Sequence, residues 1–283
     1  GYRIDTVEPV TGLPTKNYEA FDINVDASIS SSEQTALEIY KRLVGVTTPI
    51  DNPVIGQMAQ QINNGNLRGA ASIATQQPGF YNLVVRDFAA RMSTRDESIN
   101  EQFNDFTATF IGATRDNLDA RLLLTGRLFY KGSIDAAVRN DTYNDLLGSN
   151  NHYRDLEDDN YDFSAVLTRE NNQYIRTGND QFGNHPDAAG VITSRAFMGA
   201  HAIDGTNRRL VEFTVKQFAC FEMEEWADAT ASDIRVGRDI DRFPGGEGSK
   251  YLTTCKACHS VMDGFRGAFA KYDFDRNFVQ YRN

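Results

Sequence analysis

Five consecutive residues near the C-terminal end, Cys255-Lys256-Ala257-Cys258-His259, have the spacing C-x-x-C-H. Two thiols three positions apart on a tight turn can add to the two vinyl groups of one porphyrin, and the following His is then carried under the ring as an iron ligand. With 3 Cys and 4 His in the chain, composition alone produces this string in only about one chain in several thousand. The motif predicts one covalently attached haem c, held by Cys255 and Cys258, with His259 as the proximal iron ligand.

Three other interpretations of the motif stay open. A zinc site needs further ligands, and the remaining Cys, Cys220, lies far upstream beside aromatic residues that predict a buried, inert thiol. A redox disulfide between Cys255 and Cys258 would prefer a thioredoxin-like βαβ setting, which the sequence does not suggest. The third interpretation is a motif that carries no haem.

A second iron ligand must come from upstream of the motif. Met262 is the sole Met or His after His259, and it is too close to cross the ring. We favour His201 or Met198, which one helical turn presents on the same side, although Met198 and Met223 also suit core packing. His152 and His185 lie in Asn-rich turn sequence, which predicts a solvent-facing or turn-stabilising role. The candidates considered are His152, His185, His201, Met58, Met92, Met198 and Met223.

Helical periodicity dominates the first half of the chain. We expect a capping box at Ser31 and Gln34, a stop at Gly45, a helix from Asn52 and Pro53 to Gly65, and another over 66–76. Further helices are expected after Gly79, around Phe103 to Ile111, from a cap at Asp116 to Leu124, and from Asn207 to Trp226. The fold class is therefore mainly α: a helical array or bundle with an extended N-terminal arm, long irregular loops and the haem in the C-terminal part.

Asn and Asp crowd the stretch from Gly132 to Gly190, which predicts a long, irregular, partly helical connection. The acidic run 155–159 is expected to be a solvated face, and the run 273–277 has alternating oxygen donors but no following Gly. Calcium at either run is the less favoured alternative. The expected divisions are an extended arm with an edge strand near 21–25 (1–31), a helical region (32–131), the connection (132–190) and the haem-binding region (191–283).

Composition excludes some classes of function. The chain has 283 residues, 40% of them hydrophobic, with a formal net charge of -10, which disfavours nucleic-acid binding. No run approaches the roughly eighteen apolar residues of a membrane-spanning helix, so we expect no transmembrane segment. A start at Gly1 without Met is compatible with a processed, exported protein.

Two family resemblances start from these residues. The late motif followed by Phe265-Arg266 resembles the tail of class II cytochromes c, the cytochrome c′ group, whose haem motif closes a four-helix bundle. The segments 125–130, 185–193, 255–259, 262–265 and 274–275 are together similar to planctomycete-type secreted cytochrome-like proteins with a C-terminal C-x-x-C-H module. This second resemblance implies export and haem without naming a substrate.

Three hypotheses follow for function. The first is an exported monohaem c-type cytochrome, periplasmic or extracellular, that relays single electrons between redox protein partners. The second is a haem enzyme, or a gas- or peroxide-binding protein, with an open distal position. The third is a haem-bearing structural subunit of a larger extracytoplasmic assembly, in which the N-terminal arm reaches a neighbouring subunit.

Overall fold

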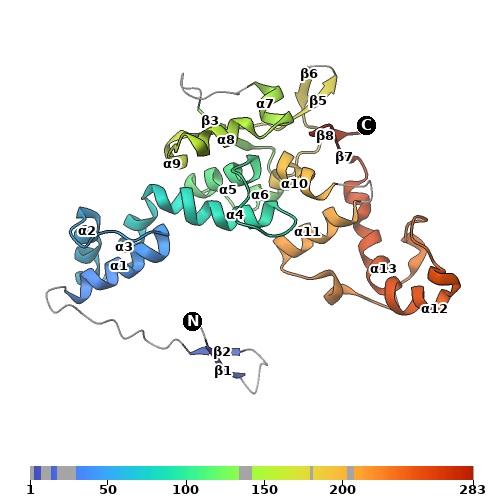
Figure 1. Ribbon diagram of the computed structural model, residues 1–283, viewed down its shortest axis with the longest axis horizontal. Coiled ribbons are helices and arrows are strands. Elements are labelled where there is room, and N and C mark those ends of the chain that lie inside the picture. The colour runs from blue at the N-terminus through green and yellow to red at the C-terminus, as the bar shows by residue number, and fades with distance from the viewer. Residues whose placement is uncertain are drawn as a thin grey trace.

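Helices form most of the fold, which confirms the mainly α expectation (Figure 1). The computed structural model describes residues 3–7, 14–17, 30–133, 142–178, 181–202 and 207–282. Strands in these ranges form only two-stranded antiparallel pairs, of which the first joins β1 (Arg3–Val7) and β2 (Pro14–Asn17). The edge strand expected near 21–25 lies outside the described residues.

Three helices pack into an N-terminal unit: α1 (Ser31–Val44), α2 (Pro53–Asn63) and α3 (Leu67–Thr75). The capping box of α1 is formed by Ser30 and Glu33, one residue before the expected pair Ser31 and Gln34. Glu33 places a negative charge in the first turn, where the helix dipole favours it. The unit has its own core, the N-terminal core, formed by Ala36, Tyr40, Val44, Ile55, Met58, Ala59, Ala70 and Ala74.

Local signals set the ends of these helices as predicted. Gly45 ends α1 with φ +81°, a backbone conformation that favours glycine. Asn52 caps α2 by accepting the N–H of Val54 at 3.0 Å, with Pro53 in the first turn. Asn66 caps α3 in the same way through the N–H of Gly69 at 2.9 Å.

A π-helical segment leads into the centre of the molecule. The π-helix η1 (Phe80–Val85) continues as α4 (Arg86–Ser93), followed by α5 (Asp105–Arg115) and the short α6 (Leu122–Thr125). The expected cap at Asp116 is wrong, because Asp116 ends α5 instead of starting the next helix. Its carboxylate accepts the Tyr130 hydroxyl at 2.5 Å, which ties the end of α5 to β3 (Phe129–Gly132).

The Asn- and Asp-rich stretch 132–190 is more ordered than expected. The elements described within it are α7 (Tyr143–Gly148), α8 (Asn151–Asp158), α9 (Phe163–Val166), β4 (Leu167–Glu170), β5 (Tyr174–Gly178) and β6 (Gln181–Asn184). It also supplies half of the central core, because α8 is amphipathic and buries Tyr153 and Leu156 on one face. The central core consists of Val85, Phe103, Ala108, Ile111, Leu128, Tyr130, Leu146, Tyr153, Leu156, Phe163, Val166 and Leu167.

The acidic run 155–159 is therefore only partly a solvated face. Asp158 and Asp159 are exposed. Glu157, by contrast, accepts a hydrogen bond from Arg86 at 2.7 Å and one from the backbone N–H of Phe103 at 3.0 Å. Through these two hydrogen bonds, Glu157 holds α8 against the segment that precedes α5.

The C-terminal part stacks three helices, α10 (Arg195–His201), α11 (Arg208–Ala219) and α13 (Lys256–Phe265), with α11 in the middle (Figure 1). Short elements surround them: η2 (Gly190–Thr193), η3 (Met223–Trp226), η4 (Asp233–Arg235), η5 (Pro244–Gly246), α12 (Gly248–Lys250), η6 (Tyr251–Cys255), η7 (Arg266–Phe269), β7 (Tyr272–Asp275) and β8 (Phe278–Tyr281). The α10 core contains Ala89, Phe106, Val191, Phe197, Met198, Ala202, Leu210 and Val279. In the described part of the chain, no helix combines the length and apolar character needed to cross a membrane.

Candidate haem-attachment site

The C-x-x-C-H motif lies where a π-helical turn passes into an α-helix. The π-helix η6 ends at Cys255, and α13 begins at Lys256. Cys255, Cys258 and His259 are therefore neighbours on one face of one helical turn. Both thiols are free and partly accessible. Tyr251 anchors the turn, since its ring is buried and its hydroxyl donates to Asp233 at 3.0 Å.

His259 has a buried nitrogen without a hydrogen-bond partner. Its Nδ1 lies 3.7 Å from Oδ1 of Asp263, one turn further along α13, which is beyond hydrogen-bond length. Asp263 was not among the predicted site residues. Its position four residues after His259 was the one signal that could have identified it.

The Asp263 carboxylate is fully buried and held by three donors. Arg208 donates from Nε to Oδ1 at 2.6 Å and from Nη2 to Oδ2 at 2.8 Å, and the Gly237 N–H donates to Oδ2 at 2.7 Å. Burial favours a raised pKa, but these hydrogen bonds outweigh it and hold the pKa of Asp263 below its usual range. Asp263 is thus a fixed carboxylate with Oδ1 3.7 Å from Nδ1 of His259.

A small apolar cluster links the motif to α11 and η3. We call it the motif cluster: Val211, Met223 and Met262, with Val215, Cys258 and Phe269 packed against them. Burial raises the pKa of Cys258, and the charges of Glu224 and Cys255 add to the effect. Cys258 thus packs as part of this apolar cluster, while both thiols of the motif are free.

The structure does not bring Met198 or His201 together with the motif. Both lie in or against the α10 core, where the His201 ring stacks on Phe213 with centroids 4.1 Å apart. Helix α11 turns Phe213 toward this core and Val211 and Val215 toward the motif cluster, so α11 separates His201 from Cys258. Burial, together with the positive charges of Arg209 and Arg95, lowers the pKa of His201 to about 3.

Met223 is the upstream candidate that shares a cluster with the motif. Met58 belongs to the N-terminal core, and Met92 packs against the α10 core. No local signal distinguishes Met223 from these residues, because its proximity to Cys258 depends on how α11 and η3 pack on α13.

His152 and His185 do not face solvent, so that part of the expectation is wrong. The buried His152 accepts the backbone N–H of Gly132 through Nε2 at 2.9 Å. His185 has the other predicted role and stabilises a turn: its Nδ1 accepts the N–H of Asp187 at 3.2 Å. Burial lowers the pKa of His185 to about 4.

Cys220 is exposed rather than buried. It ends α11 in the left-handed conformation, with φ +58°, so its side chain leaves the apolar face of that helix.

The residues that the structure describes contain no group of three His, Cys, Asp or Glu side chains arranged to hold a metal ion. The run 273–277 covers most of β7 and the turn of the β7–β8 hairpin, in which Arg276 and Asn277 both have positive φ.

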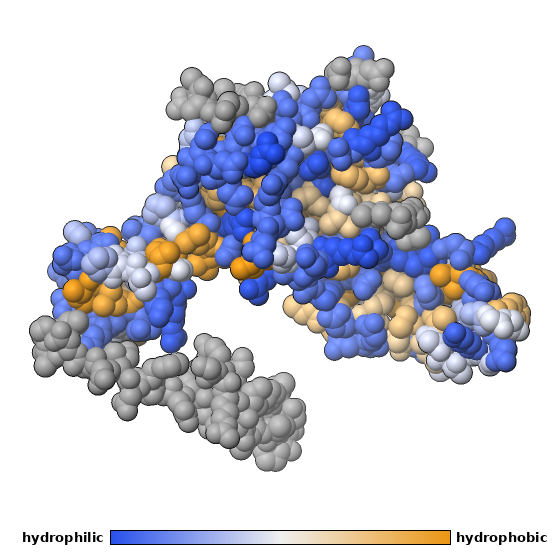
Figure 2. Space-filling view, in the orientation of Figure 1, coloured by the Kyte–Doolittle hydropathy of each residue, from blue (hydrophilic) through white to orange (hydrophobic). Residues whose placement is uncertain are grey.

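Large apolar side chains lie exposed around the motif. Leu252 is 56% and Phe265 52% exposed, and the Trp226 ring packs between Phe265 and the exposed Phe221 at centroid distances of 5.8 and 5.5 Å. Figure 2 shows hydrophobic surface in this part of the molecule, where Figure 1 places α12 and α13. Exposed apolar groups gathered beside reactive side chains are typical of a binding site. Together with the free thiols, they fit a flat apolar ring such as haem.

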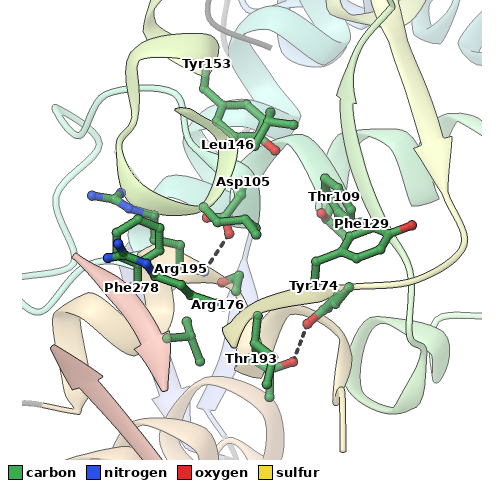
Figure 3. A pocket seen from close by; sticks show the side chains of 15 residues that line it. Asp105, Thr109, Phe129, Leu146, Tyr153, Tyr174, Arg176, Thr193, Arg195 and Phe278 are labelled. Carbon is green, nitrogen blue, oxygen red and sulfur yellow. Dashed lines mark hydrogen bonds between the residues drawn. The ribbon is translucent and has the colours of Figure 1, made fainter. Parts of the chain in front are cut away.

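A small cavity lies between α5, β5, α10 and β8, away from the motif (Figure 3). It measures about 30 Å³, which suffices for a water molecule but not for a substrate. The buried Asp105 carboxylate on its wall accepts the backbone N–H groups of Arg195 at 2.6 Å and Ala196 at 3.0 Å. Burial raises the pKa of Asp105. We interpret Asp105 as a structural link between α5 and α10.

Comparisons with known protein families, with curated proteins and with solved structures return no match for this chain.

Proposed function

We propose that this protein is an exported, monohaem c-type cytochrome, periplasmic or extracellular, that relays single electrons between redox partners. The observation that carries the proposal is the placement of Cys255, Cys258 and His259 on one helical turn, with both thiols free, beside exposed apolar side chains. Cys255 and Cys258 would hold the haem through thioether bonds, and His259 would bind the iron. The group would supply an iron centre that accepts and releases one electron.

The arrangement of α11 favours Met223 as the distal ligand over Met198 and His201. Met223 packs in the motif cluster with Cys258, whereas the other two residues lie across α11. Ligation by His and Met gives a higher potential than ligation by two His. A haem held by His259 and Met223 would therefore have a potential at the high end for single-haem proteins.

The acidic composition favours a positively charged redox partner. A net charge of -10 steers such a partner toward the surface, and this attraction weakens as salt increases. We expect the rate of electron exchange with a basic partner to fall as ionic strength rises, and a flat rate would contradict this choice of partner.

Covalent haem is the first property to test. The protein would be expressed with export and the c-type haem maturation machinery, and haem staining of a denaturing gel would report covalent attachment. Cys255→Ala/Cys258→Ala should abolish the stain, whereas Cys220→Ala should retain it, since Cys220 is exposed at the far end of α11. An unstained wild-type band would overturn the proposal.

Coordination is tested by the optical spectrum of the reduced protein with and without carbon monoxide. A six-coordinate relay leaves the spectrum unchanged. A rapid shift would indicate an open iron, and the gas- or peroxide-binding alternative would then replace the electron relay.

A further inference from the structure

We propose that Asp263 is a positioning residue that accepts the Nδ1–H of His259, and so orients the imidazole and makes its Nε2 a stronger donor to the haem iron. This inference rests on the proposed function. Nδ1 is the ring nitrogen of His259 that would not bind the iron, and Arg208 and Gly237 hold the Asp263 carboxylate near it.

The first support is a match between an empty acceptor site and an unpartnered donor. An ionised carboxylate has about four acceptor sites, two on each oxygen. Arg208 and Gly237 fill both sites on Oδ2 and one on Oδ1. The remaining site is on Oδ1, the atom that lies 3.7 Å from the buried, unpartnered Nδ1 of His259.

The second support is the difference in how firmly the two side chains are held. The Asp263 side chain is fully buried and is held by Arg208 of α11 and by the Gly237 N–H, whereas Nδ1 of His259 makes no hydrogen bond. Movement of the imidazole, rather than of the carboxylate that Arg208 holds, would bring Nδ1 within hydrogen-bond length of Oδ1. Binding of Nε2 to iron requires the ring proton to be on Nδ1, which is the tautomer that a carboxylate acceptor selects.

The third support is that Asp263 remains charged in this position. Arg208 holds both of its oxygens, and Nη1 of Arg266 lies 3.6 Å from Oδ2. An anionic acceptor draws the Nδ1 proton more strongly than a neutral one and increases the basicity of the ligating nitrogen. More electron density on the iron favours its oxidised state, so Asp263 should lower the midpoint potential.

The test compares Asp263→Asn with Asp239→Asn in the haem-loaded protein. Asp239 also binds Arg208, through Nη2 at 3.1 Å, but no contact joins it to His259 among the described residues. The readouts are the midpoint potential and the His259 Nδ1–H resonance in histidine-labelled protein. We expect Asp263→Asn to raise the potential and shift the resonance, and Asp239→Asn to leave the resonance in place and the potential close to wild type.

Equal potentials and an unmoved resonance in the two variants would overturn the role of Asp263. Absence of covalent haem in the wild type would instead overturn the proposed function, so the two failures are distinguishable. If Asp263→Asn does not fold because Arg208 loses its partner, Asp263→Asn/Arg208→Gln removes both charges. That double variant should still shift the His259 Nδ1–H resonance, and an unmoved resonance would again contradict the inference.

Discussion

Arg208 and Asp263 form a two-point ion pair, with the guanidinium Nε 2.6 Å from Oδ1 and Nη2 2.8 Å from Oδ2. The pair joins the first turn of α11 to the last part of α13, across 55 positions of sequence. The carboxylate is fully buried and the guanidinium nearly so. The ion pair therefore holds α13, which carries most of the C-x-x-C-H motif, against α11.

Replacing Arg208 with Leu should destabilise the protein because it leaves a buried carboxylate without its main partner. We expect the free energy of unfolding to fall by about 3 kcal/mol, at the low end for a broken buried pair, since Gly237 and Arg266 remain near Asp263. Urea unfolding measures the change. Arg121→Leu is the control: its pair with Asp119 is exposed, so no measurable change is expected. Equal stability of both variants would show that the buried pair adds nothing.

Gly112→Ala should disrupt the contact between α5 and β3. A Cβ at Gly112 would overlap the Tyr130 ring. Tyr130 cannot move aside easily, because its hydroxyl bonds to Asp116 and its N–H to Thr109. We expect a loss of about 2–3 kcal/mol in the free energy of unfolding. Gly56→Ala is the matched control: a Cβ at this helical position in α2 meets nothing within 4 Å, and it should add about 0.5–1 kcal/mol. A neutral Gly112→Ala would contradict the proposed tight contact.

Local chemistry explains which parts of the fold were predictable. Gly45, Asn52 and Asn66 end or start helices through contacts within a few residues, and each was predicted from its neighbours. Ser30 with Glu33 and Ser31 with Gln34 have the same spacing. Sequence pattern alone therefore could not choose between them, and the structure selects the charged pair.

Long-range packing explains what was not predictable. The motif was found because its chemistry lies within five consecutive residues. Arg208 and Met223 reach it only through the packing of α11 and η3 on α13, which no local period specifies. Helix α8 was missed because its Asn and Asp residues suggested turns, although Tyr153 and Leu156, three residues apart, already define one buried face.

His201→Phe should make the stability of the protein less sensitive to acid. Burial lowers the pKa of His201 in the folded chain to about 3, below the value near 6.5 in the unfolded chain. Between these values the unfolded chain binds the proton and the folded chain does not, so the free energy of unfolding decreases as pH falls. This cost reaches about 2–3 kcal/mol at pH 4.5.

The measurement is urea unfolding of both proteins at pH 7.5 and 4.5. Phe suits the site because His201 already stacks on Phe213 and contacts Phe197, and neither ring nitrogen has a hydrogen-bond partner. The variant should match or exceed wild-type stability at pH 7.5 and lose clearly less of it at pH 4.5. Parallel losses would mean that His201 does not titrate in this window.

Met223→Leu should remove the proposed second iron ligand while preserving the apolar packing of the motif cluster. In the oxidised, haem-loaded protein we expect loss of the weak long-wavelength absorption band that a sulfur–iron bond produces, and in the reduced protein a gain of carbon monoxide binding. Met198→Leu is the control, because Met198 is also buried but lies across α11 in the α10 core. Its spectra should match those of the wild type. The opposite result, with Met198→Leu altered and Met223→Leu unchanged, would require α10 to approach α13. The position of α11 argues against that arrangement, because α11 packs Phe213 against His201 and Val211 in the motif cluster.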